Sequence, residues 1–87
     1  MSEEETRKRA EKAIVMFDGN IRKFRLPASA SKETLKVVEL SKMYASDARS
    51  FLDKGDVPTA FASIEYAHGL LDAIRELNGQ GYGSEDG

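Results

Sequence analysis

Several residue types and patterns are missing from this sequence of 87 residues: it has no cysteine, no tryptophan, one histidine and two prolines. Without cysteine the chain can form no disulfide, no thiolate nucleophile and no cysteine-ligated zinc site. No stretch approaches the roughly 18 consecutive apolar residues of a membrane-spanning helix. The net charge is only −2, and 40% of the residues are hydrophobic, so the composition is neither strongly basic nor that of a disordered chain. What remains is a small globular protein.

The length allows one domain, because single domains usually contain about 100 to 150 residues. A chain this short buries only about 60 to 65% of its unfolded surface, so its core is marginal unless helices pack well or a second subunit helps. We predict one domain over residues 1–79 and a disordered, glycine-rich tail over residues 80–87. The first residues are acidic where a secretion signal would be basic, which predicts a cytoplasmic protein without membrane association.

Two interruptions divide the domain into three segments. Pro27 disfavours a helical conformation at the residue before it, and the serines that follow can cap a new helix. Gly55 suits a left-handed helix end, Asp56 can cap the next helix, and Pro58 fits a first turn. We therefore predict an all-α fold with helices over residues 3–25, 31–53 and 57–77. Short connections favour an up-down-up antiparallel three-helix bundle.

Apolar residues recur at steps of three and four in each segment, as expected of helices with one buried stripe. The predicted core consists of Ala10, Ala13, Ile14, Phe17, Ile21, Phe24, Val37, Val38, Tyr44, Ala45, Ala48, Phe51, Leu52, Val57, Ala60, Phe61, Ile64, Ala67, Leu71 and Ile74.

The third segment carries few charges, and the face opposite its core stripe is built mostly of small residues. This face comprises Ala62, Tyr66, Gly69 and Ala73, with Leu70 and Leu77 at its border. A mid-helix glycine costs about 1 kcal/mol relative to alanine, which indicates that another backbone approaches Gly69 closely. That backbone belongs either to a second chain or to another helix of the same chain. The first alternative predicts a homo-oligomer or a complex with another protein.

Glu65, His68 and Asp72 are spaced so that they lie along one edge of the third helix, where carboxylates and an imidazole could hold a metal or a small ligand. A complete metal site would need a homodimer and further carboxylates such as Asp47. The simpler interpretation is that Asp72 holds His68 and no cofactor binds. Tyr44 and Tyr66 could likewise form hydrogen bonds to Asp72 within the protein rather than bind a ligand.

Charge is unevenly distributed along the chain. Residues 1–44 contain ten basic and seven acidic residues, net +3, and residues 45–87 contain three and eight, net −5. A basic cluster of Arg22, Lys23, Arg25 and Lys32 could bind the phosphates of RNA, or simply complement the negative end of the first helix. The acidic total and the lack of aromatic residues among the bases other than Phe24 make nucleic acid the less favoured partner. The uneven charge could also favour head-to-tail or dimer contacts, in which the acidic third helix of one copy meets the basic first and second helices of another.

The junction of the second and third helices carries a recognisable motif. It reads FLDKGD over residues 51–56 and YAHGLLDA over residues 66–73. Over most of residues 35–77 the sequence resembles the archaeal family known as domain of unknown function 357. The resemblance implies a short cytoplasmic three-helix protein with no established activity.

No phosphate-binding loop, nucleophile elbow or catalytic triad order is present in the sequence. We therefore expect a non-catalytic module for self-association or protein interaction. The ligand-binding bundle and the RNA-associated protein remain the alternatives.

Overall fold

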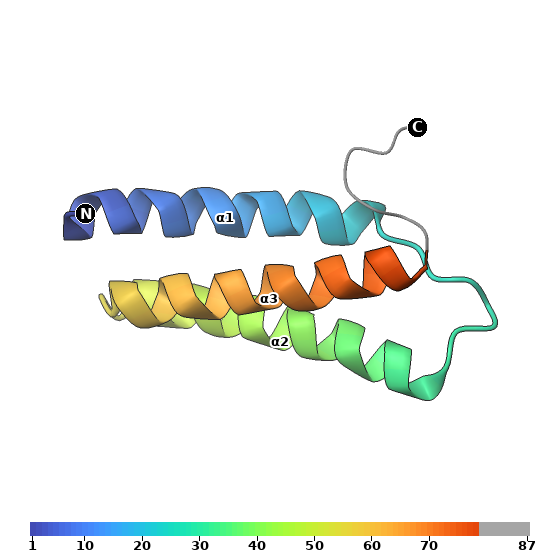
Figure 1. The fold of residues 1–87 in the computed structure, drawn as a ribbon. Helices are drawn as coiled ribbons and strands as arrows, with labels where there is room; N and C mark the ends of the chain where they lie inside the picture. Colours follow the sequence, from blue (N-terminus) through green and yellow to red (C-terminus); the bar gives the residue numbers. More distant parts are fainter. Residues whose placement is uncertain (79–87) are drawn as a thin grey trace.

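Three helices account for most of the chain that the computed structural model describes, which is residues 1–78. They are α1 (Glu3–Lys23), α2 (Lys32–Asp53) and α3 (Val57–Leu77), and no strand occurs among these residues (Figure 1). The predicted all-α three-helix bundle is confirmed. The tail predicted for residues 80–87 lies outside the described residues.

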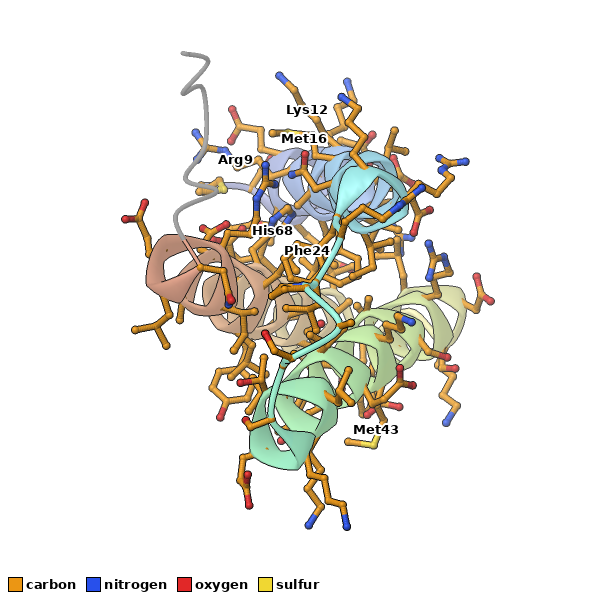
Figure 2. All side chains as sticks on the ribbon, turned by 90° about the vertical axis from the view of Figure 1, so that its right-hand side faces the viewer. Arg9, Lys12, Met16, Phe24, Met43 and His68 are labelled. Atoms are coloured by element: carbon orange, nitrogen blue, oxygen red, sulfur yellow. The ribbon has the colours of Figure 1, made fainter. Side chains whose placement is uncertain are left out.

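The bundle is centred on α3. Helices α1 and α3 point the same way and α2 runs in the opposite direction, as predicted (Figure 1). Helix α3 packs extensively on both neighbours, whereas α1 and α2 touch each other much less. An end-on view shows the helices at the corners of a triangle (Figure 2). Among the described residues, no helix is both long and apolar enough to cross a membrane.

Local sequence signals determine where each helix begins. The Ser2 hydroxyl accepts a hydrogen bond from the Glu5 N–H at 3.1 Å, and the Ser2 N–H donates to the Glu5 carboxylate at 2.9 Å, which completes a capping box. Ser31 caps α2 by accepting from the Thr34 N–H, and Asp56 caps α3. Gly55 adopts a φ of +86° between α2 and α3, a conformation that glycine reaches without steric cost.

The first helix ends two residues earlier than predicted, at Lys23 rather than at residue 25. Phe24 is already extended, with φ −70° and ψ 135°, and its ring is buried in the core. The Arg25 guanidinium donates hydrogen bonds to the carbonyls of Arg22 and Phe24 at 2.7 and 2.8 Å. The helix thus ends within two residues of the predicted bound, and Phe24 is buried as its place on the apolar stripe predicts.

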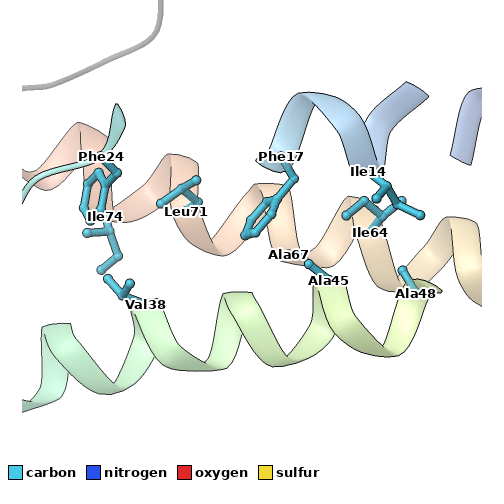
Figure 3. Packing of buried hydrophobic residues seen from close by; sticks show 10 residues of the cluster. All are labelled: Ile14, Phe17, Phe24, Val38, Ala45, Ala48, Ile64, Ala67, Leu71 and Ile74. Atoms are coloured by element: carbon cyan, nitrogen blue, oxygen red, sulfur yellow. The ribbon is translucent and has the colours of Figure 1, made fainter. Parts of the chain in front are cut away.

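The core follows the inner stripe of α3, and alanines let α2 approach it closely (Figure 3). The packed cluster contains Ile14, Phe17, Phe24, Val38, Ala45, Ala48, Ile64, Ala67, Leu71 and Ile74. Every one of these residues belongs to the predicted stripes. Ser41 is also fully buried, and its hydroxyl donates to the Val38 carbonyl at 2.7 Å, so this polar group is satisfied within its own helix.

Replacing Leu71 by alanine should lower the free energy of unfolding by about 2 to 5 kcal/mol, because it removes a completely buried side chain from the centre of the bundle. Leu35→Ala is the matched control, since Leu35 is 50% exposed and its loss should change stability by less than about 0.5 kcal/mol. Urea unfolding followed by circular dichroism measures both. Equal effects would contradict this description of the core.

The capping box should make the start of α1 sensitive to acid. The hydrogen bond from the Ser2 main-chain N–H, with that from its side chain, lowers the pKa of the Glu5 carboxyl. A lowered folded-state pKa adds stability above the ordinary pKa of glutamate, and this stability is lost as the pH falls through the lowered value. The protection of the amides in the first turn of α1 against hydrogen exchange, relative to their intrinsic exchange rates at each pH, should therefore fall below about pH 4. Glu5→Gln should flatten this dependence, whereas Glu4→Gln should leave it.

Candidate functional site

The predicted interface residues lie together on the outer face of α3. Ala62, Tyr66, Gly69 and Ala73 are all exposed, and they point away from the core stripe of the same helix. At the border, Leu77 is 81% exposed and Leu70 is half-buried. We call the set of Ala62, Tyr66, Gly69 and Ala73 the outer face of α3. It is an uncharged strip on a helix whose other faces are packed or polar.

Gly69 lies in the middle of this face with open space around it. A Cβ atom added at Gly69 would meet no atom within 4 Å, other than those of the adjoining residues and the helix backbone. Nothing within residues 1–78 therefore requires a glycine here. Of the two explanations for this glycine, close packing within the same chain finds no support.

The two tyrosines pack against each other. Their ring centroids are 4.6 Å apart and the planes meet at 84°, an edge-to-face contact that joins α2 to α3. Tyr66 remains 51% exposed. Asp72 lies on the side of α3 that faces α1, and no hydrogen bond among the described residues joins it to either tyrosine. The predicted tyrosine to aspartate hydrogen bonds are thus replaced by a ring contact.

Glu65, His68 and Asp72 all line one groove between α1 and α3. This groove has a volume of about 330 Å³ and is also lined by Ala13, Met16 and Asn20 of α1. A second hollow continues it towards the start of α1, where Arg9, Lys12 and Phe61 join the lining. Figure 2 shows Arg9 and His68 where α1 and α3 meet, on the side away from α2. Glu65 lines both hollows, so charges of both signs meet at the end near Arg9, and Asp72 lines only the first hollow.

His68 is held by α1 rather than by Asp72. Its Nε2 lies 2.8 Å from the carbonyl oxygen of Ala13, and its ring meets Phe17 edge-on with centroids 5.5 Å apart. A carbonyl oxygen can only accept, so Nε2 carries the proton and donates. The ring thus pins α1 to α3. The simpler interpretation of His68 as a structural residue had the wrong partner, because the contact depends on a main-chain atom that no residue pattern reveals.

The geometry offers no metal site around His68. In the part of the chain that the structure describes, no three His, Asp or Glu side chains lie close enough together to hold a metal ion. Asp47, the suggested additional ligand, is not among the residues that line the groove. The groove between α1 and α3 is the place that remains for a small ligand in that hypothesis.

The basic residues near the end of α1 serve the helix terminus. The Arg22 Nε donates to the Asp18 carbonyl at 3.3 Å, and Arg25 donates to carbonyls at the helix end. These contacts are those expected of cations at a negative helix terminus. Lys23 and Lys32 are exposed at opposite ends of the loop between α1 and α2. This arrangement gives no specific support to the hypothesis that these residues bind phosphate.

One cross-helix contact has no local signal in the sequence. Arg49 of α2 forms an ion pair with both carboxylate oxygens of Asp18 on α1. The two residues are separated by 31 positions in the sequence, so only the folded structure brings them together. Both side chains are more than a third exposed, and the pair therefore orients α1 against α2 more than it stabilises the fold.

Comparison with known protein families identifies the family of this chain. A family model described as "Protein of unknown function (DUF357)" matches residues 6–79. The chain belongs to the DUF357 family. No curated protein and no solved structure matches the sequence. The match confirms the predicted resemblance and extends it over α1, which the motif in α2 and α3 did not cover. Membership of DUF357 brings no established activity, so the function has to be argued from the surfaces described above.

The role of His68 predicts a defined imidazole tautomer. At a pH where the ring is neutral, nitrogen NMR should show a protonated Nε2 and an unprotonated Nδ1, because the Ala13 carbonyl requires a donor at Nε2. His68→Ala should also lower the free energy of unfolding by about 1 to 3 kcal/mol, since it removes a packed ring and a hydrogen bond between helices. A proton found on Nδ1 instead would refute the assigned contact.

Proposed function

We propose that this DUF357 protein is a non-catalytic module that associates with itself, or with another protein, through the outer face of α3. The single observation that carries the proposal is the open space around Gly69 on an exposed, uncharged helix face. A glycine at this position weakens the isolated helix, and a second backbone that packs there makes use of the missing side chain.

The chemistry of the outer face suits a protein partner. Small side chains at Ala62, Gly69 and Ala73 let another helix approach closely, while Tyr66 offers the kind of half-exposed aromatic ring that anchors interfaces. Burial of the exposed Leu77 at the border would add to the hydrophobic stabilisation. A second copy is the simplest partner, because a chain of this length gains stability from dimerisation.

The alternatives have weaker support. The one histidine is engaged by a main-chain carbonyl, the acidic edge of the groove forms no metal-holding group within residues 1–78, and Arg22 and Arg25 bond to carbonyls near the end of α1. No observation favours RNA binding or catalysis over association. The cytoplasmic location and the archaeal source expected from the sequence belong to this proposal as well, and cell fractionation tests the first of them.

Gly69→Leu should weaken association while leaving the monomer intact. Sedimentation equilibrium at tens of micromolar should show a dimer or larger species for the unchanged protein, and the substitution should raise its dissociation constant by at least about tenfold. The monomer itself should become slightly more stable, because leucine is the better helix former and the space at Gly69 is open.

Gly19→Leu is the matched control. Gly19 is also inside a helix, and an added Cβ there would likewise meet no atom within 4 Å apart from the adjoining residues and the helix backbone, but it lies on α1, four residues before its end. It should give the same small gain in helix stability and no change in association. A clean monomer at tens of micromolar for the unchanged protein would refute the self-association proposal.

A further inference from the structure

We infer that the second copy packs against α2 as well as α3, with the two copies of α2 antiparallel, so that Phe51 of each copy enters a hollow on α2 of the other. The copies are related by a two-fold axis that lies in the interface, perpendicular to α2, at the level of Tyr44. This inference rests on the proposed self-association and adds its geometry and its contacts on α2.

Four residues near the start of α2 surround a mainly apolar hollow. It has a volume of about 430 Å³ and is lined by Glu33, Lys36, Val37 and Leu40. Their positions follow the spacing i, i+3, i+4 and i+7. Four residues with this spacing form the hole that receives one side chain of a second helix in knobs-into-holes packing. The hollow therefore has the form of a socket for one large apolar side chain of a neighbouring helix.

Phe51 provides a matching side chain on the same side of α2. It follows Glu33 after about five full helical turns, so the two side chains leave the helix in the same direction. Phe51 is half-buried and lies outside the core cluster, and the Lys54 ammonium is 5.8 Å from the centre of its ring. One side of α2 therefore carries both an aromatic side chain and a socket for one, at different levels.

The hollow and Phe51 are equally far from Tyr44 along α2. Val37 precedes Tyr44 by seven residues and Phe51 follows it by seven, so with a rise of about 1.5 Å per residue each lies about 10 Å from its level. A two-fold axis at this level, perpendicular to α2 and midway between two facing copies of it, makes the two helices antiparallel and exchanges the two levels. It seats Phe51 of each copy in the hollow of the other, which gives the self-complementary contact that a two-fold interface requires.

The same axis brings the outer face of α3 into the interface. The rings of Tyr44 and Tyr66 touch, so this side of α2 continues into the outer face of α3. Helix α1 lies on the other side of the α2–α3 pair and leaves this surface open (Figure 2). The tyrosines of both copies then meet at the centre of the interface, where aromatic side chains contribute most to binding. Gly69 lies three residues after Tyr66, about 5 Å from the level of the axis, where the two copies of α3 pass each other.

Charges on this side of α2 form pairs in the antiparallel arrangement. Glu33 lies eleven residues before Tyr44 and Lys54 ten residues after it, so the axis brings Glu33 of one copy to nearly the same level as Lys54 of the other. Both residues are exposed, which gives two symmetric ion pairs at the ends of the interface. A two-fold axis parallel to the helices would place α2 against the outer face of α3, whose residues carry no charge to pair with them. Charge complementarity therefore favours a second copy in the antiparallel orientation.

Phe51→Ala tests the contact in the hollow. It should raise the dissociation constant in sedimentation equilibrium at least about tenfold, because it removes the side chain that fills the socket of the second copy. Leu35→Ala is the matched control. Leu35 is also an apolar residue of α2 and is 50% exposed, but it lies on the opposite side of the helix from Glu33, so its loss should leave association unchanged.

Charge reversal gives a test that leaves Phe51 in place. Glu33→Lys or Lys54→Glu alone should raise the dissociation constant about threefold or more, because each replaces two attractions by two repulsions. The double variant E33K/K54E restores both pairs with inverted sign and should recover the dissociation constant of the unchanged protein. Helix stability cannot explain such a recovery, since both substitutions are unfavourable to the dipole of α2 and the double variant carries both. Glu39→Lys makes the same change in charge on another side of α2 and should have no effect.

The absence of native cysteine allows the register to be measured directly. A short bismaleimide should join an equimolar mixture of the single variants E33C and K54C into a crosslinked heterodimer. It should join neither variant to itself, because identical positions lie about 30 Å apart in this arrangement. If the protein dimerises and Gly69→Leu dissociates it, but Phe51→Ala and charge reversal act no more than their controls and the mixture does not crosslink, this geometry is refuted while the proposed self-association stands. A monomeric unchanged protein refutes both.

Discussion

Burial of the inner stripe of α3 is the constraint on which the other features of the bundle depend. Val57, Ile64 and Leu71 alternate along this stripe with Ala60 and Ala67, and all five are completely inaccessible to solvent. Both neighbouring helices pack on this stripe and touch each other far less. The alanines set a short distance between α2 and α3, and the larger side chains fill the space towards α1. With its inner side occupied in this way, α3 leaves its opposite face to solvent, and that face carries the proposed interface.

Most of the fold could be predicted because helix periodicity and capping are local properties. Ser2, Ser31 and Asp56 start the helices where the sequence places them, and the buried cluster falls on the predicted stripes. The prediction that was wrong concerns a contact between distant residues. His68 bonds to a main-chain oxygen on another helix rather than to Asp72. This contact has no signature in residue type or spacing.

The candidate site was predictable in its members but not in its arrangement. The spacing of Glu65, His68 and Asp72 correctly places them on one edge of α3, and the structure shows that this edge faces α1 across a groove. The other half of the groove, including Arg9 and Met16, could not be identified because its residues lie about fifty positions earlier in the chain. The packing of the whole bundle decides which helices become neighbours. It therefore also decides which side chains line the groove between two helices.

The contact between His68 and Ala13 has a consequence for how this family can vary. The acceptor is a main-chain oxygen, and every amino acid supplies one, so the hydrogen bond places no demand on the side chain at position 13. Size is the remaining restriction there, since Ala13 is half-buried beside the groove. Among related sequences, a histidine at the position of His68 would therefore be retained without any paired change on α1. A search for co-varying positions would overlook the bond that joins these two helices.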